Sequence, residues 1–160
     1  MAAGEHEING VAHVVFRVNR FDECIAFYDG LMPHLGLEAV FRSLWAVYYV
    51  GGRTGLLIRR TEPEHTGAGY TDTGPGIDHL CFRARSRAHV DALYPVLQEL
   101  GADIVRAPEE GPFAPGYYSL SWRDPEGIRL ELSHVPGRGV FAEGALFDPA
   151  PEYPLEGRGG

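Results

Sequence analysis

A nine-residue pattern occurs twice in this 160-residue chain, and it constrains the fold more than any other feature of the sequence. Residues 10–18 read GVAHVVFRV and residues 76–84 read GIDHLCFRA. Both stretches are rich in apolar and β-branched residues, which is typical of strands. His13 and His79 hold the same place in the two copies, 66 residues apart (79 − 13). We interpret the pattern as an internal duplication.

The same elements are predicted after each copy. A helix follows the first copy, with Asp22 as its expected cap, and another follows the second, with Ser86 as its cap. Each helix ends at a Leu-Gly pair that leads into a short strand. Two more strands complete each half, at 45–50 and 56–60 and at 117–122 and 128–134, joined by turns that contain Gly or Pro. Each half is therefore predicted to be a βαβββ module.

The fold class predicted is α+β, with the whole chain, 1–160, as a single domain. Its first module covers about 8–60, a polar linker covers 61–75, and the second module covers about 76–135. The Gly- and Pro-rich remainder, 136–160, is expected to be a tail. A module of this size buries too little surface by itself, so the two curled mixed sheets are expected to share a core and to enclose a metal-binding cavity.

Charge and composition exclude several classes of partner. The formal net charge of −8 argues against nucleic acid and against anionic membranes. No apolar run approaches the roughly 20 residues that span a bilayer, and the first ten residues do not resemble a signal peptide. The chain has two cysteines in unlike contexts, which favours a reducing, cytoplasmic location.

Glu131 is the carboxylate that, together with the two histidines, makes up a candidate set of metal ligands. It lies between Leu130 and Leu132 in the last predicted strand, where it either faces solvent or faces the cavity. An unpaired carboxylate in a cavity is costly, and a metal ion compensates it. His13, His79 and Glu131 have the composition of the two-histidine, one-carboxylate set that holds a divalent transition metal and leaves positions open.

The paired modules, their opening histidines and the stretch GYYSLSWRDPEGIRLEL (116–132) resemble the vicinal oxygen chelate superfamily. This group contains glyoxalases, bleomycin-resistance proteins and dioxygenases. The resemblance covers about residues 8–135. It implies the fold and a metal held by His13, His79 and Glu131, but no particular reaction.

Alignment of the turn glycines Gly55 and Gly127 places Arg59 opposite Glu131. Relatives of the glyoxalase I and epimerase type usually have a fourth ligand there, so Arg59 favours a three-ligand set. Within the superfamily, a three-ligand set resembles that of small type I extradiol dioxygenases, which use Fe(II) and O₂ to cleave a catechol. This narrower resemblance makes L-3,4-dihydroxyphenylalanine (L-DOPA) the favoured substrate and a homodimer the expected assembly. Two alternatives stay open. One is an isomerase or a fosfomycin-type thiol transferase that uses Zn, Ni or Mn, and the other is a metal-free drug-binding protein.

The extradiol signature normally carries a Tyr where this chain has Ser121, and a His upstream of it that is missing here. Replacement acid or base groups are sought in Tyr117, His65 and His134, although either histidine also fits a solvated surface position. The residues expected to contact the substrate are Arg59, Tyr49 and Ser121. Arg59 suits a substrate carboxylate, and it equally suits a surface position.

Overall fold

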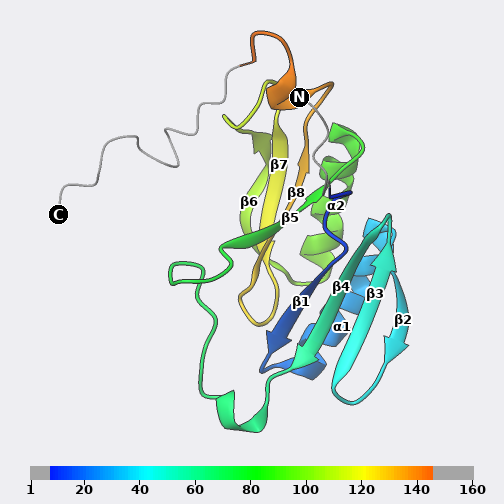
Figure 1. Ribbon diagram of the computed structural model, residues 1–160, viewed down its shortest axis with the longest axis vertical. Helices are drawn as coiled ribbons and strands as arrows, with labels where there is room; N and C mark the ends of the chain where they lie inside the picture. The colour runs from blue at the N-terminus through cyan, green and yellow to red at the C-terminus, as the bar shows by residue number, and fades with distance from the viewer. Residues whose placement is uncertain (1–7, 146–160) are drawn as a thin grey trace, which may run out of the picture. The chain divides into compact units, whose positions relative to one another are not determined.

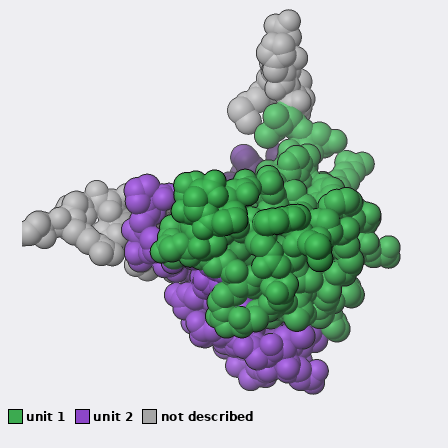
Figure 2. All heavy atoms as spheres, turned by 90° about the horizontal axis from the view of Figure 1, so that it is seen from below, with its two compact units in different colours: residues 1–69 green, residues 70–160 purple. Residues whose placement is uncertain are grey.

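The computed structural model describes residues 8–145 and consists of two compact units, which meet in the sequence at Gly69 and Tyr70 (Figures 1 and 2). The expected tail residues 146–160, and residues 1–7, lie outside the described part of the chain. In the described part, no helix is long and apolar enough to cross a membrane.

Among the described residues, each unit contains one α-helix and one four-stranded mixed sheet (Figure 1). Short 3₁₀ helices lie at Met32–Leu35 and Pro63–His65 in the first unit and at Gly139–Phe141 in the second. The first unit runs β1 (His13–Val18), α1 (Phe21–Leu31), β2 (Glu38–Arg42), β3 (Ala46–Gly51) and β4 (Thr54–Arg60), with strand order β1-β4-β3-β2. The second runs β5 (His79–Arg83), α2 (Arg87–Glu99), β6 (Asp103–Glu110), β7 (Tyr118–Arg123) and β8 (Arg129–His134), with order β5-β8-β7-β6. The predicted βαβββ repeat and the α+β class are confirmed.

Strand alternation separates a helix-covered face from an open face in each sheet. In the first unit Phe16, Tyr49 and Ile58 are buried toward α1, which contributes Cys24 and Tyr28 to the same core. His13, Val15 and Arg17 point to the other face, and all three are exposed. The repeated histidines therefore belong to the face that the helices leave uncovered.

The two helices begin differently. Ser86 caps α2 as predicted, because its Oγ accepts a hydrogen bond from the backbone N–H of His89 at 3.3 Å. The expectation that Asp22 caps α1 is wrong. The helix begins at Phe21 with Arg20 in the cap position, so Asp22 lies in the first turn. There its carboxylate still favours the helix, since it faces the positive end of the macrodipole.

The turn that joins β3 to β4 and the turn that joins β7 to β8 differ in length. β3 and β4 are joined by Gly52 and Arg53, both with positive φ (54° and 68°), as in the tight turns that suit a two-residue hairpin. β7 and β8 are joined by residues 124–128, where Asp124 Oδ1 accepts a hydrogen bond from the Ile128 N–H at 2.8 Å. The first of the two turns is therefore the shorter.

Candidate metal and substrate site

Glu131 is the centre of the candidate site in the second unit. It lies on β8, is 5% exposed, and pairs with Cys81 of β5 and Ser121 of β7 on the open face. Tyr117, just before β7, donates its hydroxyl hydrogen to Glu131 Oε1 at 2.7 Å. The other carboxylate oxygen, Oε2, lies 3.1 Å from His79 Nε2. One buried carboxylate is thus shared between a tyrosine and a histidine.

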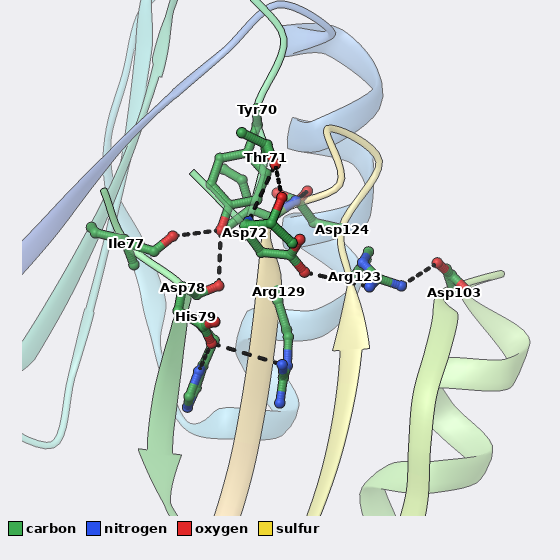
Figure 3. Close-up of polar contacts among 12 residues, drawn as sticks. Tyr70, Thr71, Asp72, Ile77, Asp78, His79, Asp103, Arg123, Asp124 and Arg129 are labelled. Carbon is green, nitrogen blue, oxygen red and sulfur yellow. Dashed lines mark hydrogen bonds and ion pairs between the residues drawn. The ribbon is translucent and has the colours of Figure 1, made fainter. Parts of the chain in front are cut away.

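His79 lies between two carboxylates, of which Figure 3 shows that of Asp78. Its Nε2 faces Glu131, and its Nδ1 is hydrogen-bonded to Asp78 Oδ1, which belongs to the residue before the strand. Arg129 Nη1 lies 3.7 Å from the same Asp78 oxygen. Figure 3 shows the His79 ring and the Arg129 guanidinium side by side with the Asp78 carboxylate. Both ring nitrogens of His79 therefore have acidic partners.

These contacts change the pKa values of the group. Burial alone would raise the pKa of Glu131, but hydrogen bonds from His79, Tyr117 and Ser119 outweigh it and hold that pKa at about 2. The hydrogen bond to Glu131 raises the pKa of His79, against the effect of burial. Burial, with the hydrogen bond to Glu131, raises the pKa of Tyr117. At neutral pH the site holds an anionic carboxylate beside a protonated tyrosine.

Two polar atoms on this face have no hydrogen-bond partner. Ser121 Oγ and Arg129 Nε are buried and unpaired, and both residues flank Glu131 in the sheet. Buried polar groups are nearly always satisfied, so such atoms indicate a place for water or a ligand. Cys81 is exposed as a residue, yet its thiol is partly enclosed and donates to Ser133 Oγ at 3.2 Å. Burial raises the pKa of that thiol to about 12, so it stays protonated.

The first unit presents the matching histidine. His13 starts β1 and pairs with Gly55 of β4. The Tyr48 ring stands edge-on to the His13 imidazole, with ring centroids 6.5 Å apart. A Cβ atom at Gly55 would lie 2.3 Å from the Tyr48 hydroxyl oxygen, so glycine leaves the space that this tyrosine occupies. His13 has no carboxylate neighbour equivalent to Asp78, because Ala12 precedes it.

The register of the strands corrects the expected match between Glu131 and Arg59. His13 pairs with Gly55 and His79 pairs with Arg129, which sets an offset of 74 residues between β4 and β8 (129 − 55). Glu131 therefore corresponds to Leu57, not to Arg59. Leu57 cannot bind a metal, so the first unit still offers no second carboxylate at this place. The expectation of three metal ligands stays a prediction, and it now rests on Leu57 and not on Arg59.

The same register shows where the other expected site residues lie. Tyr117 and Ser121 lie beside Glu131. Arg59 lies on the open face of the first unit, 3.8 Å from Glu62 Oε1. His65 is exposed in a short 3₁₀ turn, Pro63–His65, in the linker. For these four residues, the expected roles in substrate binding and proton transfer stay proposals.

Two expected residues lie on the wrong face for their role. Tyr49 is 1% exposed on the helix-covered face, and its hydroxyl donates to Asp29 Oδ1 at 2.7 Å. It pairs with Leu56, whereas Tyr48 pairs with Leu57 on the open face. His134 pairs with Tyr118 on the helix-covered face of β8, opposite to Glu131, and its Nδ1 lies 3.4 Å from Ala84 O. Strand alternation is the reason in both cases.

The donor set fits a divalent transition metal, but the described residues complete no site within either unit. No group of three or more His, Cys, Asp and Glu side chains among residues 8–145 is placed to hold one ion. The second unit supplies one imidazole nitrogen and one carboxylate, and the first supplies His13 on the corresponding strand. Imidazole with carboxylate is the donor chemistry of open iron, manganese and zinc sites.

Asp78, Arg129 and Tyr48 are not among the expected site residues, yet they lie in these surroundings. Asp78 precedes the strand, so alternation says nothing of where its side chain lies. Arg129 occupies the open-face position two residues before Glu131, and strand alternation alone was a sufficient signal for it. Tyr48 requires the register of β3 against β4, which only the paired strands give.

Comparison with known proteins assigns the family. The family model of the Glyoxalase/Bleomycin resistance protein/Dioxygenase superfamily matches residues 10–132. A candidate glyoxalase from Bacillus halodurans is similar in structure, with a TM-score of 0.69, 32% sequence identity, and coverage of 79% of this chain and 96% of that one. No curated protein matches the chain.

Further solved structures share the fold. A glyoxylase/bleomycin resistance protein/dioxygenase domain from Frankia sp. has a TM-score of 0.63 at 25% identity, covering 80% of this chain and 98% of its own. Lactoylglutathione lyase from Agrobacterium tumefaciens has a TM-score of 0.60 at 24% identity, covering 81% and 96%. The second likeness, at this identity, concerns the fold alone. With its duplicated βαβββ units and the match over residues 10–132, the chain belongs to the glyoxalase/bleomycin resistance protein/dioxygenase superfamily.

Proposed function

We propose that this protein is an Fe(II)-dependent extradiol dioxygenase that cleaves the ring of a small catechol, with L-DOPA as the favoured substrate. In this proposal His13, His79 and Glu131 hold the metal. The observation that supports it most is the 3.1 Å separation of His79 Nε2 and Glu131 Oε2. Two metal–ligand bonds of about 2.1 Å at a right angle place their donor atoms about 3 Å apart.

The surroundings of the pair suit this chemistry. An iron ion held by two histidines and one carboxylate would supply open positions for a catecholate and for O₂. Tyr117 holds Glu131 through Oε1, which leaves Oε2 on the side of His79. The unpaired hydroxyl of Ser121 lies next to Glu131 in the sheet and is free to bind a substrate oxygen.

Tyr117 is the best placed group to handle a proton. Its pKa is raised, so its hydroxyl stays protonated, and the one hydrogen that it donates to Glu131 in this structure would instead go to a substrate oxygen bound beside that carboxylate. Of the two histidines proposed for the same task, His134 lies on the other face of β8. His65 lies in the linker, and for it the role stays a proposal. Arg59 stays the proposed partner of a substrate carboxylate, in competition with Glu62.

A glyoxalase-like isomerase is the second candidate, because the Bacillus halodurans protein at 32% identity is described as a candidate glyoxalase. Relatives of the glyoxalase I type usually have a fourth ligand, commonly Glu or Gln, near the place equivalent to Glu131, and in this chain Leu57 occupies that place. This difference favours the dioxygenase. The cytoplasmic location and the homodimer stay predictions.

The test is oxygen uptake by the iron-loaded protein. The protein is loaded anaerobically with Fe(II), L-DOPA is added, and air is admitted while O₂ and the visible spectrum are recorded. We expect stoichiometric uptake and a growing yellow ring-fission product. Glu131→Gln should abolish both, whereas Glu110→Gln, which changes an exposed carboxylate that pairs with Arg87, should not.

Controls decide between the candidates. Iron bound without any uptake would exclude L-DOPA as substrate, and a panel of other catechols would then follow. Hemithioacetal isomerisation by the Zn- or Ni-loaded protein, with no reaction of any catechol, would favour the isomerase instead. Activity that persists in Glu131→Gln would contradict the assignment of the site.

A further inference from the structure

One carboxylate in the second unit contacts both a candidate metal ligand and a neighbouring cation, and the proposed function gives it no role. Asp78 Oδ1 is hydrogen-bonded to His79 Nδ1 and lies 3.7 Å from Arg129 Nη1 (Figure 3). Its side chain is 56% exposed, while that of His79 is 26% exposed. Asp78 therefore lies at the solvent-exposed edge of the candidate site and is not part of the hydrophobic core.

The backbone fixes this carboxylate where it is. Asp78 directly precedes β5, so it does not follow the alternation of the strand. The Tyr70 hydroxyl lies 2.7 Å from Ile77 O and 2.9 Å from Asp78 O, which anchors the two residues that lead into the strand. Arg129, paired with His79 across β5 and β8, holds the carboxylate from the other side.

We infer that Asp78 is a positioning residue for His79: it holds the imidazole so that Nε2 points to Glu131 and to a metal bound there. A histidine that donates its Nδ1 hydrogen to a carboxylate keeps one tautomer and one ring orientation, and its Nε2 lone pair is left for the metal. This inference rests on the metal-binding part of the proposed function, but not on the catechol reaction.

The two halves of the repeat differ in this respect. Ala12 precedes His13 at the place where Asp78 precedes His79, so the first unit has no such carboxylate. Within its own unit, His13 has an edge-on contact with the Tyr48 ring instead. In the second unit, the hydrogen bond to Asp78 thus holds His79 in a fixed orientation before a metal binds.

The experiment uses the full chain with Asp78→Ala, Asp78→Asn and a matched control, Asp103→Asn. Asp103 is also an exposed aspartate, 68% by side chain, and it pairs with Arg123 at 3.3 Å in the same unit. The first readout is the hydrogen-bonded Nδ1–H resonance of His79 in the metal-free protein, followed by NMR with ¹⁵N-labelled histidine. The second is the affinity for Co(II) or Fe(II) alone, measured by competition with a chelator.

We expect Asp78→Ala to remove the protected Nδ1–H signal and to weaken metal binding about 10- to 100-fold, the usual effect of losing such a partner. Asp78→Asn keeps an acceptor oxygen and should restore the signal and most of the affinity. Asp103→Asn should change neither. Thermal unfolding of the metal-free variants should be close to that of the wild type, because Asp78 is exposed.

Three results would overturn the inference: a wild-type chain that binds no divalent metal, an Asp78→Ala variant that keeps the Nδ1–H signal, or one that loses the signal but keeps the affinity. A wild-type chain that binds metal but cleaves no catechol would contradict only the proposed reaction. The positioning role of Asp78 would then still be supported by the first two readouts.

Discussion

Leu57 and Glu131 occupy equivalent positions in the two sheets, because each lies two residues beyond the strand partner of the repeated histidine. At this position of the repeat, the second copy has a carboxylate, Glu131, and the first copy has an apolar side chain, Leu57. The proposed ligand set therefore contains two histidines but only one carboxylate. The asymmetry leads to the first prediction.

Leu57→Glu should convert the three-ligand set into a four-ligand one. Leu57 lies on the open face with His13 and is only partly buried, so a carboxylate fits there without a large cost to folding. We expect tighter binding of divalent metal and a loss of at least tenfold in oxygen-dependent turnover, because an open position is filled. Chelator competition and oxygen uptake measure the two effects. Unchanged values for both would show that Leu57 does not face the metal.

Tyr117→Phe removes the hydroxyl that donates to Glu131 at 2.7 Å. We expect turnover to fall about 100-fold, the lower range for a lost acid–base group, while the metal stays bound. The free energy of unfolding should fall by about 1 kcal/mol, the net value of a typical hydrogen bond. Steady-state oxygen uptake and urea unfolding provide the values. A Tyr117→Phe enzyme with wild-type turnover would remove this tyrosine from the proposed chemistry.

The sequence predicted the repeated βαβββ units because apolar periodicity, helix stops and turn residues agree in both halves. It misplaced the match of Glu131 by two residues. The alignment relied on Gly55 and Gly127, but Gly55 lies inside β4 after a two-residue turn, whereas Gly127 lies in the longer turn before β8. Turn length is set by backbone geometry, and the strand pairing that reveals it involves residues far apart in the sequence.

The same limit explains Tyr49. Two adjacent tyrosines on a strand must face opposite sides, but which of them faces the helix depends on the register with β4. For Asp78 no periodic rule applies, because it precedes its strand. His134 is different, since alternation from Glu131 along the same strand was enough to place it on the helix-covered face.

Tyr49→Phe should act on stability alone. The hydroxyl of Tyr49 donates to Asp29 in the contact between α1 and the sheet, away from the open face. We expect a loss of about 1 kcal/mol in the free energy of unfolding and no change in substrate KM. Tyr48→Phe is the matched control and should leave stability within about 0.5 kcal/mol, because no hydrogen bond in the core is lost. An increase in KM for Tyr49→Phe would contradict this placement.

Asp29 should contribute stability that is lost in acid. Burial would raise the pKa of Asp29, but hydrogen bonds from Arg42 and Tyr49 together lower it. A pKa lowered in the folded state stabilises the protein above the unfolded value of about 3.8, and this gain disappears as the pH falls through the folded pKa. Asp29→Asn should therefore lower stability at pH 7 and flatten the decline below about pH 4. Urea unfolding from pH 7 to pH 2.5 measures both. A parallel decline in the two proteins would contradict the prediction.

The central proposal is that His13, His79 and Glu131 are ligands of one divalent metal, and metal stoichiometry tests it most directly. The wild-type chain, loaded anaerobically with Fe(II) and freed of excess metal, should retain one iron per chain. His13→Ala, His79→Ala and Glu131→Ala should each retain almost none, while His65→Ala should retain iron as the wild type does. Full retention of iron by His13→Ala would remove His13 from the proposed ligands, and full retention by Glu131→Ala would contradict the proposal as a whole.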